Sequence, residues 1–166
     1  MHHPEHYRPI IDFLIRIGVP IAETPLPDDT FLPGIALQAG RLLVDPDKLL
    51  WPGDLLHEAG HIAVLPSSLR SALNDDLSDD IDAEFASEAE AMAWAYAAAM
   101  EVGLPLDALI HEGGYKGRSL EVLSMYSFGI YPGLRGLCET GMAAAPGFTP
   151  DCGDIRYPRM LAWLRD

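Results

Sequence analysis

The sequence DLLHEAGHIAVL occupies residues 54–65 and contains the pattern His-Glu-x-x-His, formed by His57, Glu58 and His61. Apolar residues flank the pattern and Pro66 follows it, which predicts an apolar helix that ends near residue 65. With 3.6 residues per turn, two histidines four positions apart project from the same face of a helix. Their imidazoles can therefore reach one metal ion.

Glu58 follows the first histidine and lies about 100° further around the helix. At that angle its carboxylate flanks a metal held by His57 and His61, and it would contact a bound water as a general base. Burying three polar groups in so apolar a helix costs several kcal/mol, and a metal ion removes that cost. The alternative interpretation is a pair of structural histidines in an ordinary helix.

A catalytic zinc site usually has a third protein ligand, which is expected downstream. Residues 81–102 predict a long Ala-rich helix that stops at Gly103, and it carries Glu84, Glu88 and Glu90. Glu88 is selected as the ligand because it lies deeper in the helix than Glu84. Glu84 and Glu90 remain alternative candidates for the third ligand. The non-functional interpretation of each is a solvated acidic residue near a helix N-terminus.

The remaining signals complete an α+β, mostly helical chain with one domain over residues 1–166. A β-hairpin is expected at residues 34–38 and 41–44, joined by Ala39-Gly40, and it should pack on the helix at 54–65 and on the long helix. Irregular connections are expected at residues 19–33, 67–80 and 111–117. Further helices are expected at residues 7–17, 106–110, 120–128, 134–142 and 158–164.

Composition excludes several function classes. The chain has 166 residues, of which 49% are hydrophobic, and 25 acidic against 11 basic side chains give a formal charge of −14. Such a chain repels nucleic acid and anionic membranes. No apolar run approaches the roughly 18 residues of a membrane span, and no signal peptide is visible, so a cytoplasmic protein is expected. Cys138 and Cys152 are expected to be free thiols. For the N-terminal cluster of His2, His3 and His6, weak metal binding is one interpretation, and an exposed, frayed tail is preferred.

The order of these features resembles the ImmA/IrrE-type metallopeptidases, compact members of the gluzincin group. The resemblance covers residues 34–105: hairpin, Asp-Pro, helix with His-Glu-x-x-His, then helix with Glu-x-Glu-Ala. It implies a small zincin-like domain in which His57, His61 and Glu88 bind zinc and Glu58 is the base. The chain departs from the family at Met92, where an asparagine often stands.

Two residues in the C-terminal half are candidates for stabilising a developing oxyanion. His111, Tyr115, Arg118 and Tyr126 have side chains of the required types, and His111 and Tyr126 are preferred. His111 lies beside Gly113-Gly114, where the backbone can approach a ligand closely. The alternatives are a loop histidine and a core tyrosine.

Together these observations predict a zinc-dependent peptidase or related amide hydrolase with Zn²⁺ as cofactor and a peptide or protein as substrate. Zinc is preferred because two imidazoles and one carboxylate suit it. Neither nucleic acid nor a membrane is an expected partner, and no oligomeric state is predicted. One alternative is a metal-stabilised regulatory or protein-binding module without turnover, and another is a helical protein in which the motif is accidental.

Overall fold

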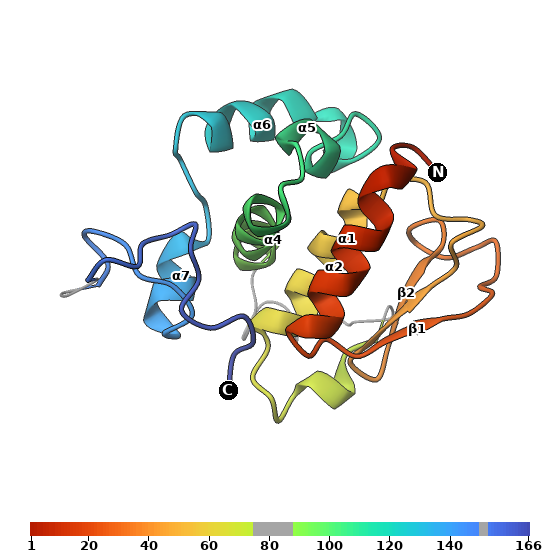
Figure 1. Cartoon of the computed structure of the whole chain (residues 1–166), viewed down its shortest axis with the longest axis horizontal. Coiled ribbons are helices and arrows are strands. Elements are labelled where there is room, and N and C mark those ends of the chain that lie inside the picture. The colour runs from red at the N-terminus through yellow and green to blue at the C-terminus, as the bar shows by residue number, and fades with distance from the viewer. Residues whose placement is uncertain (75–87, 150–152) are drawn as a thin grey trace.

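The computed structural model describes residues 1–74, 88–149 and 153–166. Within these residues the chain forms helices around a central helix pair, with a small sheet at one side (Figure 1). The α-helices are α1 (Tyr7–Arg16), α2 (Gly53–Val64), α4 (Glu88–Val102), α5 (Leu106–Leu109), α6 (Ser119–Ser127) and α7 (Leu134–Glu139). The strands are β1 (Ile21–Glu23), β2 (Ile35–Gln38) and β3 (Arg41–Val44), and the 3-10 helices are η1 (Pro4–His6), η2 (Arg70–Ala72) and η3 (Tyr115–Gly117). The predicted α+β class is confirmed for the described residues.

The sheet contains the predicted hairpin and one strand that was not predicted. β2 and β3 pair antiparallel, and Ala39 and Gly40 between them have φ angles of 49° and 70°. Two positive φ angles are typical of a type I′ turn, whose twist matches that of the strands. β1 runs parallel to β3 and gives the order β1-β3-β2. The expectation of an irregular connection at residues 19–33 was wrong for Ile21–Glu23, a three-residue strand among prolines.

The centre of the fold is the contact between α2 and α4. Every residue of α4 from Ala91 to Ala99 is buried, as its Ala-rich sequence predicts. An ideal Cβ built on Gly60 of α2 would lie 2.6 Å from the carbonyl oxygen of Ala91, so this contact requires a glycine. Side chains of α1, α2, α4 and the sheet share one core cluster. Residues 81–87 of the predicted long helix lie outside the described residues.

The C-terminal segment differs from the prediction. Residues 158–164 were expected to form a helix, but no helix is present there. This segment, the C-terminal strap, instead packs against the helices. The Trp163 ring meets the rings of Phe13 and Trp94 edge-on, and Trp94 Nε1 donates to the Trp163 carbonyl at 2.8 Å. Arg165 donates its backbone N–H to the Ala63 carbonyl at the end of α2. These tertiary contacts override the helical pattern.

The other short helices follow the predictions more closely. α5 and α6 confirm the helices expected at residues 106–110 and 120–128. α7 ends three residues before the predicted end at residue 142, and Gly141, two residues beyond the helix, has a φ of 74°. Among the described residues, no helix combines the length and the apolar character that a membrane span requires.

Candidate metal centre

Helix α2 presents His57 and His61 side by side. Their Nε2 atoms lie 3.3 Å apart, and the two rings meet edge-on with centroids 5.0 Å apart. This arrangement follows from the four-residue spacing, which repeats the side-chain direction after one turn. The two imidazoles therefore point toward one location beside the helix.

Helix α4 contributes Glu88 to the same location. One carboxylate oxygen lies 3.0 Å from His57 Nε2, and the other lies 3.3 Å from His61 Nε2. The close approach at Gly60 explains this placement, because Gly60 stands between the two histidines and touches Ala91, about one turn after Glu88. The structure thus brings together the three residues predicted as metal ligands.

The three side chains fit a tetrahedral metal ion. Ligands about 2.0–2.1 Å from such an ion are separated from one another by about 3.3 Å. His57 Nε2 and His61 Nε2 are separated by 3.3 Å, and each has one of the two Glu88 oxygens at 3.0 or 3.3 Å. One ligand atom from each residue lies within 4.8 Å of the other two. Two neutral imidazoles and a carboxylate also suit zinc, although other late first-row metals accept the same ligands.

The surroundings of Glu88 keep its carboxyl ionised, and its side chain is more exposed than those of the two histidines. Hydrogen bonds from His57 and His61 hold the pKa of the Glu88 carboxyl well below its ordinary value. The Glu88 side chain is 69% exposed, whereas those of His57 and His61 are 16% and 10% exposed. Glu88 is therefore the most exposed of the three candidate ligands.

Glu58 lies in a more protected environment than Glu88. Burial raises the pKa of the Glu58 carboxyl, the nearby His57 and His61 oppose that shift, and the carboxylates of Asp54 and Glu88 add to it. A carboxylate whose pKa is raised toward neutrality can accept a proton and release it again. The electrostatics of Glu58 therefore match the predicted general base.

His111 lies beside the first turn of α2. Its Nε2 is 2.8 Å from Asp54 Oδ1, and its ring stacks on Trp51 with centroids 4.3 Å apart. The residue is only 4% exposed, and its Nδ1 is buried without a hydrogen-bond partner among the described residues. Gly113 allows this packing, since a Cβ there would lie 2.8 Å from Trp51 Nε1. His111 is thus buried against Asp54, one turn before Glu58, with little surface left for a substrate.

Tyr126 lies in a cluster of aromatic rings. Its ring packs against those of Tyr96 and Tyr131, and its hydroxyl is 3.5 Å from the Pro132 carbonyl oxygen. The residue is 2% exposed. These contacts agree with the alternative interpretation of Tyr126 as a core tyrosine.

Tyr115 is nearer to the candidate ligands. Its hydroxyl lies 3.3 Å from the sulfur of Met92, one turn after Glu88 on α4. Burial raises the pKa of Tyr115, and the carboxylates of Asp54 and Glu88 raise it further. Tyr115 has a left-handed φ of 56°, a conformation that residue type alone does not reveal, so no pattern in the sequence favours Tyr115 over the other candidates.

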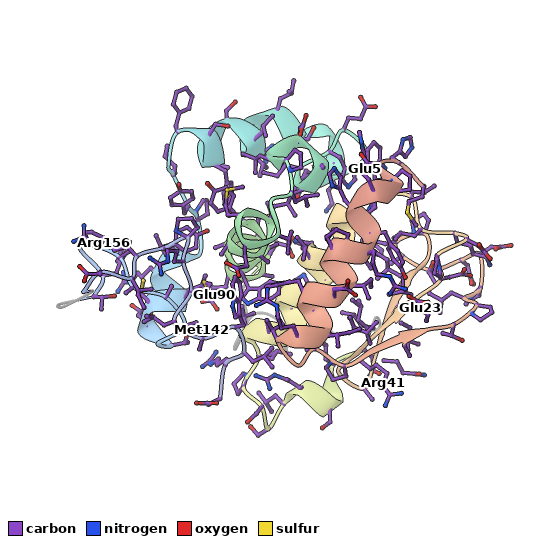
Figure 2. The ribbon with its side chains drawn as sticks, in the orientation of Figure 1. Glu5, Glu23, Arg41, Glu90, Met142 and Arg156 are labelled. Atoms are coloured by element: carbon purple, nitrogen blue, oxygen red, sulfur yellow. The ribbon has the colours of Figure 1, made fainter. Side chains whose placement is uncertain are left out.

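The other residues considered from sequence lie elsewhere. Glu90 faces α7, where a Cβ on Gly136 would collide with its carboxylate, and burial raises its pKa (Figure 2). Arg118 pairs with Glu121 at 2.6 Å on the surface. Glu84 and Cys152 lie outside the described residues, and Cys138 is half-buried.

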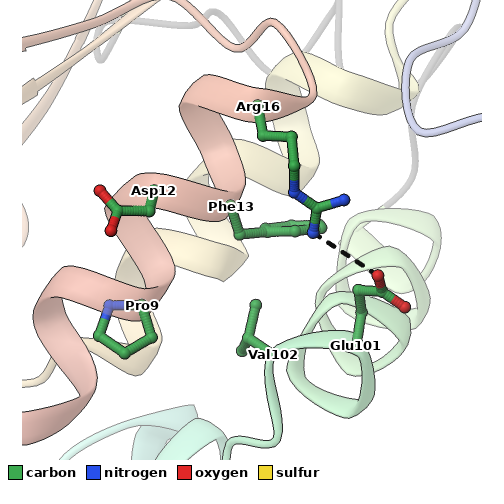
Figure 3. A pocket seen from close by; sticks show the side chains of 6 residues that line it. All are labelled: Pro9, Asp12, Phe13, Arg16, Glu101 and Val102. Atoms are coloured by element: carbon green, nitrogen blue, oxygen red, sulfur yellow. Dashed lines mark ion pairs between the residues drawn. The ribbon is translucent and has the colours of Figure 1, made fainter.

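A separate pocket lies between α1 and α4. It has a volume of about 290 Å³, and its lining includes Phe13, Arg16 and Glu101 (Figure 3). Arg16 crosses it, pairing with Glu101 at 3.5 Å and lying over the Phe13 ring. Glu101 is thirteen residues after Glu88 on the same helix, which separates the two by about 20 Å. This pocket is therefore distinct from the candidate metal centre.

Comparisons with protein-family models, with curated proteins and with solved structures found no significant match to this chain. The resemblance to the ImmA/IrrE-type metallopeptidases accordingly stays a prediction that rests on the motif and the order of elements.

Proposed function

We propose that this protein is a zinc-dependent peptidase of a small zincin-like fold, in which His57, His61 and Glu88 hold the metal. The observation that carries the proposal is the convergence of three side chains: His57 Nε2 and His61 Nε2 lie 3.3 Å apart, and each lies 3.0–3.3 Å from one oxygen of the Glu88 carboxylate. The ligands come from two helices whose contact depends on Gly60. The exposed side of Glu88 offers an approach for a peptide.

A zinc ion held by His57, His61 and Glu88 would polarise the scissile carbonyl and would lower the pKa of a water from about 15.7 towards 7. Glu58 would accept a proton from the water that attacks the carbonyl carbon. The same carboxyl then donates that proton to the nitrogen of the leaving amine as the peptide bond breaks. The raised pKa of Glu58 suits both transfers, because the group must hold a proton between them.

Asp54 and His111 act through Glu58 in this proposal. Their hydrogen bond of 2.8 Å fixes the first turn of α2, one turn before the base. The Asp54 carboxylate also contributes to the raised pKa of Glu58. We therefore assign His111 a positioning role. Tyr126 is buried, and we assign it no contact with substrate.

The first test is the metal content of the purified full chain, measured by elemental analysis beside His57→Ala and Glu88→Ala. We expect about one tightly held zinc ion per chain in the parent and its loss in both variants. Glu23→Ala, which removes another exposed carboxylate, is the matched control and should keep the metal. A parent that takes up no zinc when zinc is offered would overturn the proposal.

The second test separates catalysis from a metal-stabilised module without turnover. Glu58→Gln should keep zinc and lose about 10²–10⁴-fold in the hydrolysis of a peptide library. Glu112→Gln, an exposed glutamate in the loop after His111, should retain activity. Full activity in Glu58→Gln would refute the role of the base, and zinc binding without hydrolysis by the parent would favour the binding module.

A further inference from the structure

A second group of metal-ligating side chains lies at the N-terminal end of α1, where Figure 2 labels Glu5. Glu5 Oε1 lies 3.4 Å from His3 Nδ1 and 3.7 Å from His6 Nε2. One ligand atom from each of the three residues lies within 4.8 Å of the other two. The three residues are separate from the candidate metal centre on α2 and α4.

The segment that carries this group is docked on the protein, which corrects the expectation of a frayed tail. His2 donates its backbone N–H to the Leu50 carbonyl at 2.7 Å, and its ring stacks on Trp51 with centroids 4.0 Å apart. The 3-10 helix η1 then leads directly into α1. His2 is therefore engaged with the protein, while the histidines that follow it remain available.

The backbone turns at His3 so that its ring meets His6. His3 has a φ of 52°, in the left-handed region that a residue with a side chain rarely adopts. The His3 and His6 rings lie with centroids 5.9 Å apart. The two imidazoles therefore stand on the same side of the segment as Glu5 before any ligand arrives.

We propose that His3, Glu5 and His6 form a second metal site, which binds a late first-row divalent cation such as Zn²⁺ or Ni²⁺. Imidazole and carboxylate are ligands that these ions accept. Two of the separations, 3.4 and 3.7 Å, are already close to the roughly 3.3 Å expected around a tetrahedral ion. The third is at most 4.8 Å, so it closes by rotation of exposed side chains.

This site binds more weakly than the centre on α2. The side chains of His3, Glu5 and His6 are 55%, 62% and 22% exposed, so water competes for the ion and completes its coordination. Because the exposed side chains lose rotational freedom on binding, part of the binding free energy is spent on ordering them. The expected behaviour is a second, exchangeable ion beside a tightly held one.

The test is a zinc titration of the chelator-treated full chain without a polyhistidine tag, followed by calorimetry. The parent should bind two ions per chain with different affinities, and His57→Ala should retain only the weaker one. In the His57→Ala background, replacing both His3 and His6 with alanine should weaken the remaining site by at least about tenfold. Glu5→Gln should also weaken it, whereas the matched Glu23→Gln should not.

The outcomes distinguish this proposal from the proposed function. An unchanged weaker site after substitution of His3 and His6 would overturn the second site, as would a parent that saturates at one ion removed by His57→Ala. A parent that binds a single ion, lost only on substitution of His3 and His6, would support this proposal and refute the zinc centre on α2. Circular dichroism of each variant checks that the fold is retained.

Discussion

Gly60 offers the sharpest test of how the candidate metal centre is built. A Cβ on this residue would lie 2.6 Å from the Ala91 carbonyl oxygen and 3.2 Å from the Ala91 Cα, where ordinary contact begins at 3.4 Å. Gly60→Ala therefore requires α4 to recede from α2 by about 0.8 Å or the side chains around it to distort. Such overpacking costs about 1–3 kcal/mol in the free energy of unfolding.

The same displacement should reach the metal ligands, because Ala91 and Glu88 lie on neighbouring turns of α4. Moving Glu88 away would widen the 3.0 Å and 3.3 Å separations from His57 and His61 beyond those of a tetrahedral site. We expect Gly60→Ala to lower both the Tm, by about 2–10 °C, and the affinity for zinc.

Thermal unfolding by circular dichroism and competition with a zinc chelator measure the two effects of Gly60→Ala. Gly114→Ala is the matched control, since its Cβ would meet its nearest neighbour at 3.4 Å and Gly114 has a φ of −105°. It should match the parent in both measurements. An unaltered Tm and zinc affinity in Gly60→Ala would refute the argument that this glycine sets the distance between the helices.

Four further predictions concern the site and its supports. Zinc at about a hundred times its Kd should stabilise the parent protein by about 2.7 kcal/mol, which raises its Tm by about 5–10 °C. A chelator should change the Tm of His57→Ala little. If the chelator lowered the Tm of the parent and of His57→Ala equally, the ligand assignment would be contradicted. Burial raises the pKa of Glu58 in the folded protein above its ordinary 4.5. The fold therefore loses stability as the pH rises through that pKa and the buried carboxyl ionises. Glu58→Gln should therefore unfold at higher denaturant concentration than the metal-free parent at about pH 7.5, and the gain should vanish near pH 4; a gain independent of pH would exclude this cause. Asp54→Ala should lower the free energy of unfolding in urea by about 1–3 kcal/mol, because it leaves His111 buried and unpaired. Asp54→Asn should lower it less. Equal losses in the two variants would argue against a hydrogen-bond effect. Tyr126→Phe should retain most of the peptidase activity and the Tm of the parent, because the Tyr126 hydroxyl makes only a 3.5 Å contact. A large loss of kcat would indicate that Tyr126 takes part in the active site.

The parts of the fold that follow local rules could be predicted from the sequence. The hairpin requires a positive φ at Gly40, and the long buried helix requires an Ala-rich run, and both are visible in the residues, whereas the positive φ of Ala39 is not. The pairing of His57 with His61 likewise requires only the geometry of one helix. The placement of Glu88 depends on a contact between two helices, and the predicted long helix at residues 81–102 left three glutamates, Glu84, Glu88 and Glu90, as candidates for the third ligand.

The remaining features depend on tertiary contacts that no local pattern encodes. His111 has a residue type suited to catalysis, yet its burial against Trp51 and Asp54 became visible only in the structure. The proximity of Tyr115 to α4 depends on left-handed backbone conformations within η3. The helical pattern at residues 158–164 was outweighed by the contacts of Trp163 and Arg165 with the helices.

The C-terminal strap has a consequence for the order of events during biosynthesis. Arg165 Nη1 donates to the Val64 carbonyl, a partner 101 positions earlier, and Arg70 of η2 donates to the Arg165 carbonyl. In a nascent chain the residues of α2 are made long before Arg165, so the Ala63 and Val64 carbonyls at the end of that helix lack these partners until residue 165 follows. The helix that carries His57 and His61 therefore reaches its final packing only after nearly all of this sequence has been translated.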